Sequence, residues 1–145
     1  MAEFASGRRA ALVAMSSWVL AAAVPAAAQD PRSSAAQAAA LAWVKLADAD
    51  DAAATYDQAS QRFRAAITRE RWADSLKKAR EKFGPVVRRT HASTRTPGPG
   101  KDTPPGEFLM LVFRTEFGRR GQGTETMTME REPDGTWRVS GYLMR

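Results

Sequence analysis

The spacing of hydrophobic and polar positions changes near the middle of the chain. Up to about residue 83, apolar side chains recur at steps of three and four residues, which is the spacing of an amphipathic helix. From about residue 86, apolar and polar positions mostly alternate, which is typical of β-strands. Helices followed by closely connected strands favour an α+β domain, with three N-terminal helices packed on a curled four-stranded antiparallel sheet.

Three helices are predicted over residues 33–48, 51–67 and 68–83. A side chain that can cap a helix stands at each expected start, and Gly84-Pro85 ends the third helix because proline has no amide donor. The expected N-caps are Ser33 or Ser34, Asp51, and Thr68. The predicted buried stripes are Ala36, Ala39, Ala40, Trp43, Val44 and Ala47; Tyr56, Ala59, Ser60, Phe63 and Ile67; and Trp72, Leu76, Ala79 and Phe83.

The second half predicts four strands, a Pro/Gly-rich loop and a tight turn. The strands are expected over residues 86–95, 107–117, 124–132 and 136–144, the loop over 96–106 and the turn at Pro133-Asp134-Gly135. The second strand has Leu109, Leu111, Phe113 and Phe117 on one face and Phe108, Met110, Val112, Arg114 and Glu116 on the other. In the last strand, strict alternation places Trp137, Val139 and Leu143 opposite Arg138, Ser140 and Tyr142.

The N-terminal segment predicts export. Arg8-Arg9 precedes an apolar run over residues 10–24, and Ala26-Ala27-Ala28 offers the small residues that signal peptidase accepts. The sequence therefore predicts a signal peptide over residues 1–28, cleaved between Ala28 and Gln29, and a periplasmic or secreted protein. A retained signal anchor is the alternative, although the run is shorter than the ~20 apolar residues that span a bilayer. The paired arginines leave a twin-arginine export route open.

The absence of cysteine limits the chemistry of the chain. It excludes a lipoprotein anchor, disulfides, thiol catalysis and cysteine-ligated metal sites. His91 is the only histidine, so a Ser-His-Asp arrangement has one possible base and a zinc site would depend on carboxylates. We therefore expect no metal and no cofactor. The length after cleavage predicts a short leader over residues 29–35 and one domain over residues 36–145.

Positive charge is concentrated in one segment. Glu3 and two arginines lie before the cleavage site, so the remaining chain has 20 basic and 15 acidic residues and a net charge of +5. Residues 62–101 hold 12 basic residues against three acidic ones. An exposed basic patch there would bind anionic lipid, a cell-wall polymer or another exported protein, and nucleic acid is not expected outside the cytoplasm. The alternative is that these charges serve solubility and meet the negative end of a helix dipole. The patch residues are Lys77, Lys78, Arg88 and Arg89.

A second group of residues could line a ligand site on the sheet. Arg114 and Glu116 extend an apolar strand face into a charged one, which is the composition of a half-open pocket. Arg138 and Tyr142 could join that face from the last strand, with Tyr142 as a hydrogen-bond donor. The alternative is a strand that emerges into solvent, where such charges pair weakly.

Two further side chains could take part in catalysis but are better explained by structural roles. His91 is a possible general base, but no partner for it is recognisable. Tyr56, next to Asp57, lies in an apolar stripe and is expected to be a core residue with its hydroxyl hydrogen-bonded.

The chain shares a set of residues with a known family. They are Trp43, Ser60, Phe63, Trp72, Gly84, Gly106-Glu107-Phe108, Phe117, Glu125-Thr126 and Asp134-Gly135-Thr136-Trp137-Arg138-Val139-Ser140-Gly141-Tyr142. This pattern resembles the exported bacterial domain of unknown function 4019 over about residues 36–145. The resemblance implies a cone-shaped sheet similar to cystatin-like or nuclear-transport-factor-like folds. It implies no reaction and no established site, because fold analogy does not replace a site argument.

Two classes of function remain. The sequence favours a non-catalytic exported module that binds a partner or a small or anionic ligand. The alternative is a small pocket enzyme that uses acid and base residues on the sheet, among them His91, Glu116 or Tyr142, in proton transfer. A cluster of ionisable groups with shifted pKa values inside a closed cavity would favour the enzyme.

Overall fold

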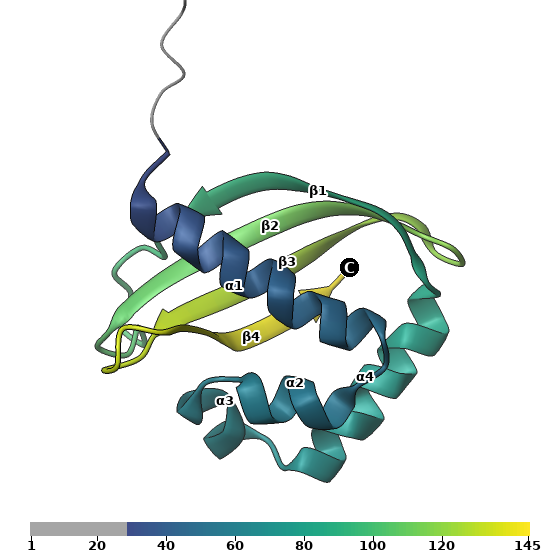
Figure 1. Cartoon of the computed structure of the whole chain (residues 1–145), viewed down its shortest axis with the longest axis horizontal. Coiled ribbons are helices and arrows are strands. Elements are labelled where there is room, and N and C mark those ends of the chain that lie inside the picture. Colours follow the sequence, from purple (N-terminus) through teal and green to yellow (C-terminus); the bar gives the residue numbers. More distant parts are fainter. Residues whose placement is uncertain (1–28) are drawn as a thin grey trace, which may run out of the picture.

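The computed structural model describes residues 29–145, so the predicted signal peptide lies outside the described residues. Four helices precede four strands, which pair antiparallel in the order β1-β2-β3-β4. The α+β fold is confirmed, with four helices in place of the three predicted. In Figure 1, α1 lies across one face of the curled sheet; α3 packs on β4, and α2 packs on α1 and α4. The elements are α1 Pro31–Asp48, α2 Ala52–Gln58, α3 Gln61–Ala66, α4 Arg69–Phe83, β1 Val86–Arg95, β2 Glu107–Phe117, β3 Gly121–Arg131 and β4 Trp137–Met144.

Helix α1 begins earlier than the serine caps predicted. The side chain of Asp30 accepts a hydrogen bond from the Arg32 amide at 3.1 Å, and Pro31 occupies the first turn. Proline suits that position because the first amides of a helix have no acceptor within the helix. The predicted buried stripe is confirmed in the described structure, since Ala36, Ala40, Trp43, Val44 and Ala47 are buried.

The single helix predicted over residues 51–67 is wrong, because the chain breaks into α2 and α3. Ala59 and Ser60 are extended, and the Ser60 amide donates to the Val139 carbonyl of β4 at 2.8 Å. The Ser60 hydroxyl then accepts from the Phe63 amide at 3.1 Å and caps α3. The Ser60 amide therefore bonds to the sheet and not to a helical carbonyl, and the helix is interrupted there.

The core lies between the helices and the inner face of the sheet. Leu109, Leu111 and Phe113 are buried there, as the alternation of β2 predicts. Two tryptophans from different helices converge on Thr55: the indole of Trp43 donates to its carbonyl and the indole of Trp72 to its hydroxyl. The polar atoms of the aromatic core are thus hydrogen-bonded.

A β-bulge in β4 changes which side chains enter the core. Thr128 pairs with Gly141 and Met129 with Val139, so Ser140 is an extra residue between them. After the bulge, Tyr142 lies opposite buried Met127 and packs against the core, while Leu143 is exposed. The predicted common face of Arg138, Ser140 and Tyr142 is therefore wrong, because one inserted residue reverses the alternation.

A bulge at Val87 has the same effect in β1. Val86 pairs with Phe117 and Arg88 with Glu116, so exposed Val87 is the extra residue. Arg89 consequently lies opposite buried Thr115 on the inner face. The bulges in the edge strands β1 and β4 thus place Arg89 and Tyr142 on the inner face of the sheet.

Candidate functional site

A fully buried carboxylate occupies the inner face of β3. Glu125 is 0% exposed and accepts hydrogen bonds from Arg89 Nε at 2.5 Å, Arg89 Nη2 at 2.9 Å and Thr115 Oγ1 at 2.6 Å. The Tyr142 hydroxyl donates to Oε1, the oxygen that also accepts from Arg89 Nη2. Burial of a charge is costly unless it is paired and hydrogen-bonded, and these four contacts meet that requirement.

Arg89 connects Glu125 to the end of α1. Its Nη1 lies 2.8 Å from Asp48 Oδ2 and its Nη2 lies 3.0 Å from Asp48 Oδ1. Burial alone would lower the pKa of Arg89, but hydrogen bonds and charges from Asp48 and Glu125 outweigh it and raise the pKa above its ordinary value. The guanidinium is a permanent positive charge between two carboxylates.

Tyr142 is held as a proton donor. Burial, followed by the negative charge of Glu125, raises the pKa of the Tyr142 hydroxyl well above its ordinary value. Its ring packs edge-on against Trp43, with 5.2 Å between ring centroids. The hydroxyl therefore keeps its proton at physiological pH and is aimed at Glu125.

Arg80 of α4 meets the same aspartate from the other side. Its Nη1 and Nη2 donate to Asp48 Oδ1 and to the Asp48 carbonyl, each at 3.1 Å. Its Nε forms an ion pair with Asp50 Oδ1 at 3.5 Å. We call Tyr142, Glu125, Arg89, Asp48 and Arg80 the buried polar chain.

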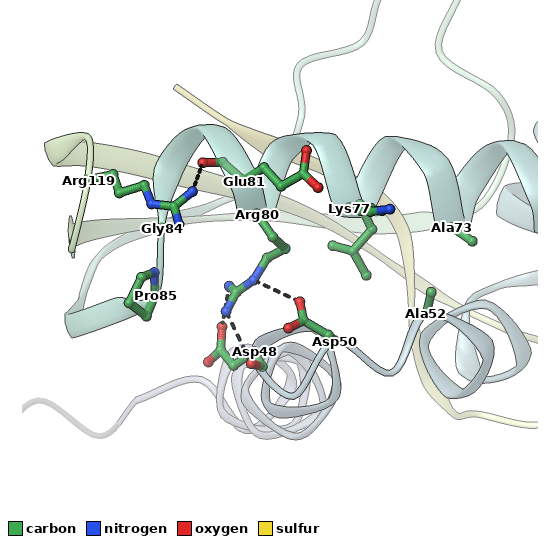
Figure 2. Close-up of a pocket in the computed structure, with 11 residues that line it drawn as sticks. Asp48, Asp50, Ala52, Ala73, Lys77, Arg80, Glu81, Gly84, Pro85 and Arg119 are labelled. Atoms are coloured by element: carbon green, nitrogen blue, oxygen red, sulfur yellow. Dashed lines mark hydrogen bonds and ion pairs between the residues drawn. The ribbon is translucent and has the colours of Figure 1, made fainter.

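The buried polar chain ends in a groove of about 640 Å³, which we call the α4 groove. Figure 2 shows Arg80 reaching from α4 toward Asp48 and Asp50 across it. The groove combines charged side chains with apolar ones such as Leu76 and Pro85. Its lining residues are Asp48, Asp50, Ala52, Ala73, Leu76, Lys77, Arg80, Glu81, Gly84, Pro85 and Arg119.

Gly84 allows the turn between β2 and β3 to close one end of the groove. The Arg119 and Arg120 amides donate to the Phe83 carbonyl at 3.0 and 3.1 Å. Gly84 has a φ of 78°, and a Cβ there would lie 2.7 Å from the Arg119 nitrogen. Glycine is thus required both for its conformation and for the close approach. Arg119 Nη1 then donates to the Glu81 carbonyl at 2.7 Å and lies at the groove.

The four side chains expected to face a ligand on the sheet are not brought together. Arg114 is exposed, and Glu116 on the same outer face lies 3.8 Å from Arg88. Arg138 pairs with Glu132 at 3.1 Å, near the turn before β4. Tyr142 lies on the inner face, because of the bulge.

The predicted basic patch is only partly on the surface. Lys77 is exposed and lines the α4 groove, Lys78 pairs with Asp74 at 2.8 Å, and Arg88 is exposed. Arg89 was expected to be at least partly exposed, and only 11% of its side chain is accessible. The bulge at Val87 turns it inward.

The contacts of His91 and Tyr56 indicate structural roles for both side chains. His91 Nε2 lies 2.8 Å from Thr94 Oγ1, and its ring packs edge-on against Phe113. The Tyr56 hydroxyl lies 3.1 Å from the Arg64 carbonyl oxygen and 3.0 Å from that of Ile67, which confirms the core interpretation.

Across residues 29–145, no group of His, Asp and Glu side chains is placed to hold a metal ion. In the same part of the chain, every helix is too short or too polar to cross a membrane.

Sequence reasoning missed Glu125, Asp48 and Arg80. One signal was present for Glu125, because it shares strand parity with the apolar Met127 and Met129. Residue Asp48 falls at the end of the predicted 33–48 helix and Arg80 within the predicted 68–83 helix, and neither was singled out as a site residue. Nothing local distinguishes these two residues from solvated ones.

Comparison with known proteins identifies one family. The family model described as "Protein of unknown function (DUF4019)" matches residues 39–142. No curated protein gives a significant match. The likeness to cystatin-like and nuclear-transport-factor-like folds stays a prediction.

Proposed function

The chain belongs to the DUF4019 family, whose description assigns no activity, and we propose that it is a non-catalytic module that binds a small anionic ligand in the α4 groove. The groove volume of about 640 Å³ falls in the range of small-molecule sites. Ala52, Ala73 and Pro85 offer apolar surface to the body of such a ligand. Charged groups beside them would orient its anionic end.

The observation that carries the proposal is that basic side chains at the groove keep unused hydrogen-bond donors. Arg80 uses two of its five N–H groups in hydrogen bonds and Arg119 uses one. Lys77 has no interaction with any other residue drawn in Figure 2. The oxygens of Asp48, by contrast, already accept from Arg80 and Arg89. Unused donors on guanidinium groups favour a ligand rich in acceptors, such as a carboxylate or a phosphate.

Binding is favoured over proton transfer because the ionisable groups of the buried polar chain around Glu125 are enclosed. Glu125 is fully buried, and its oxygens are occupied by Arg89, Thr115 and Tyr142. A general acid or base must reach the proton that it transfers. Glu116 lies on the opposite face of the sheet, away from these groups.

The location that we propose is outside the cytoplasm, in the periplasm or secreted. The support is the basic start, apolar run and small-residue site of residues 1–28. N-terminal sequencing of the protein from its native compartment should begin at Gln29. An intact chain beginning at Met1 and retained in the membrane would contradict export by cleavage.

Titration followed by amide NMR tests the groove. Benzoate and phenyl phosphate should shift the amides of Ala73, Lys77 and Arg119, whereas neutral benzyl alcohol should shift them much less. Arg119→Gln should weaken binding of both anions. Arg114→Gln is the matched control, because it removes an equal charge from the outer face of the sheet. The proposal fails if neither anion shifts these amides or if the two variants weaken binding equally.

A further inference from the structure

Two carboxylates approach Arg80 in different ways. Asp48 forms hydrogen bonds with Arg80 through its side chain and its carbonyl, and it is also held by Arg89. Asp50 lies 3.5 Å from Arg80 Nε in an ion pair, and 74% of its side chain is exposed, against 28% for Asp48. Solvent-exposed ion pairs contribute little free energy, so the Asp50 contact is easily exchanged.

The backbone of Asp50 has a conformation that side chains rarely adopt. Its φ is 57°, and it is the one non-glycine residue with a positive φ in the part of the chain described here. The turn is held by the Asp50 amide, which donates to the Ala47 carbonyl at 3.1 Å, and by the Asp51 amide, which donates to the Leu46 carbonyl at 3.0 Å. Aspartate and asparagine tolerate this conformation better than most residues, and such positions are enriched at ligand clamps.

From these two observations we propose that Asp50 occupies the anion subsite of the α4 groove in the free protein. Its carboxylate holds the place of the ligand's anionic group on Arg80. When the ligand binds, its carboxylate or phosphate takes over the Nε–H and a free Nη–H of Arg80, and the Asp50 side chain turns to solvent. This inference rests on the proposed function of the same groove.

The exchange selects oxyanions with two acceptor oxygens. Asp50 meets Arg80 through one oxygen only, at 3.5 Å. A guanidinium edge offers two parallel N–H groups and binds carboxylates or phosphates in a bidentate manner. A ligand with a carboxylate or phosphate monoester therefore gains a second hydrogen bond that Asp50 does not make. Release of Asp50 also removes a negative charge from contact with Arg80.

The test compares two acidic residues of the same groove. Asp50→Asn removes the competing charge while keeping a residue that tolerates positive φ, and Glu81→Gln removes a groove charge that is not paired with Arg80. Asp50→Asn should bind benzoate and phenyl phosphate about three-fold more tightly, the equivalent of one exposed ion pair. Glu81→Gln should strengthen binding less, because it removes charge from the groove without freeing an N–H of Arg80. If Asp50→Asn is unfolded by thermal melting, Asp50→Gly replaces it, because glycine adopts this φ freely.

The outcomes separate the two proposals. Equal binding of these anions by the parent, Asp50→Asn and Glu81→Gln overturns the role of Asp50 and leaves the groove as an anion site. Binding by none of the three overturns the proposed function itself. In the parent, the side-chain carboxyl ¹³C signal of Asp50 should shift during the titration more than that of Glu81, and a larger shift at Glu81 would contradict the exchange.

Discussion

The two faces of the sheet hold charge in different ways, and the adjacent residues Arg88 and Arg89 show the difference. The Arg88 side chain is 75% exposed and lies 3.8 Å from Glu116, a loose surface pair. Arg89 is 11% exposed and holds Asp48 and Glu125 in four hydrogen bonds. Exposed pairs contribute little to stability, whereas removing one partner of a buried pair is strongly destabilising. The number of charges in a segment therefore says little about which of them the fold depends on.

The largest expected effect comes from removing the buried acid. Glu125→Ala leaves the Arg89 guanidinium buried with one carboxylate partner and should lower the free energy of unfolding by about 3–5 kcal/mol. Glu116→Ala removes the partner of Arg88 on the outer face and should stay within about 0.5 kcal/mol of the parent. Urea unfolding followed by tryptophan fluorescence measures both. Similar losses for the two variants would remove the contrast between the faces.

A smaller effect is expected at the end of the buried polar chain. Tyr142→Phe deletes the hydroxyl that donates to Glu125 and should cost about 1–3 kcal/mol at neutral pH, because a buried acceptor loses a donor. The ring and its contact with Trp43 are kept, so the loss reports the hydrogen bond. A variant as stable as the parent in urea would mean that water or Arg89 replaces the hydroxyl.

The same residue gives a dependence on alkaline pH. Burial and the charge of Glu125 raise the pKa of Tyr142 in the native state, whereas an unfolded tyrosine loses its proton near pH ~10. Above that pH the native state binds more protons than the unfolded state, so stability falls as pH rises. Tyr142→Phe should therefore lose stability less steeply than the parent in urea titrations between about pH 9 and 11. Parallel curves for parent and variant would be evidence against the shifted pKa.

The smallest expected effect belongs to an exposed pair on the helical side. The hydrogen bond from Arg69 lowers the pKa of Asp57 below its ordinary value. The pair's contribution is present above the unfolded pKa of about 3.9 and is lost as pH falls below it. Asp57→Asn should therefore lower the melting temperature slightly at pH 7, and not at all at a pH below the native pKa. High salt should reduce the difference in melting temperature between parent and variant at pH 7. A decrease in melting temperature that does not depend on salt would contradict a solvent-exposed Arg69–Asp57 pair.

Sequence alone predicts the parts of the fold that depend on regular spacing. The apolar stripe of α1 and the alternation of β2 both identify buried residues correctly, because each element keeps one period over its length. Trp72 is buried for the same reason, and Trp137 is buried because it precedes the bulge in β4. The α+β architecture follows from the change of period in the chain.

The candidate site depends on interruptions of that spacing, which the sequence does not reveal. The bulges at Val87 and Ser140 are defined by pairing with the neighbouring strand, so they cannot be identified from the local sequence. The break at Ser60 similarly depends on a carbonyl of β4. Arg89 and Tyr142 reach Glu125 only through these irregularities, and the buried polar chain was therefore not predictable from periodicity.

The carbonyl of Phe83 links the β2-β3 hairpin to the α4 groove. Phe83 ends α4, yet the two amides that it accepts belong to the turn between β2 and β3, more than thirty residues later in the chain. The closed end of the α4 groove therefore depends on the β2-β3 hairpin being formed. A substitution that loosens the hairpin at Gly121, outside the groove lining, should then weaken ligand binding without altering a single contact residue.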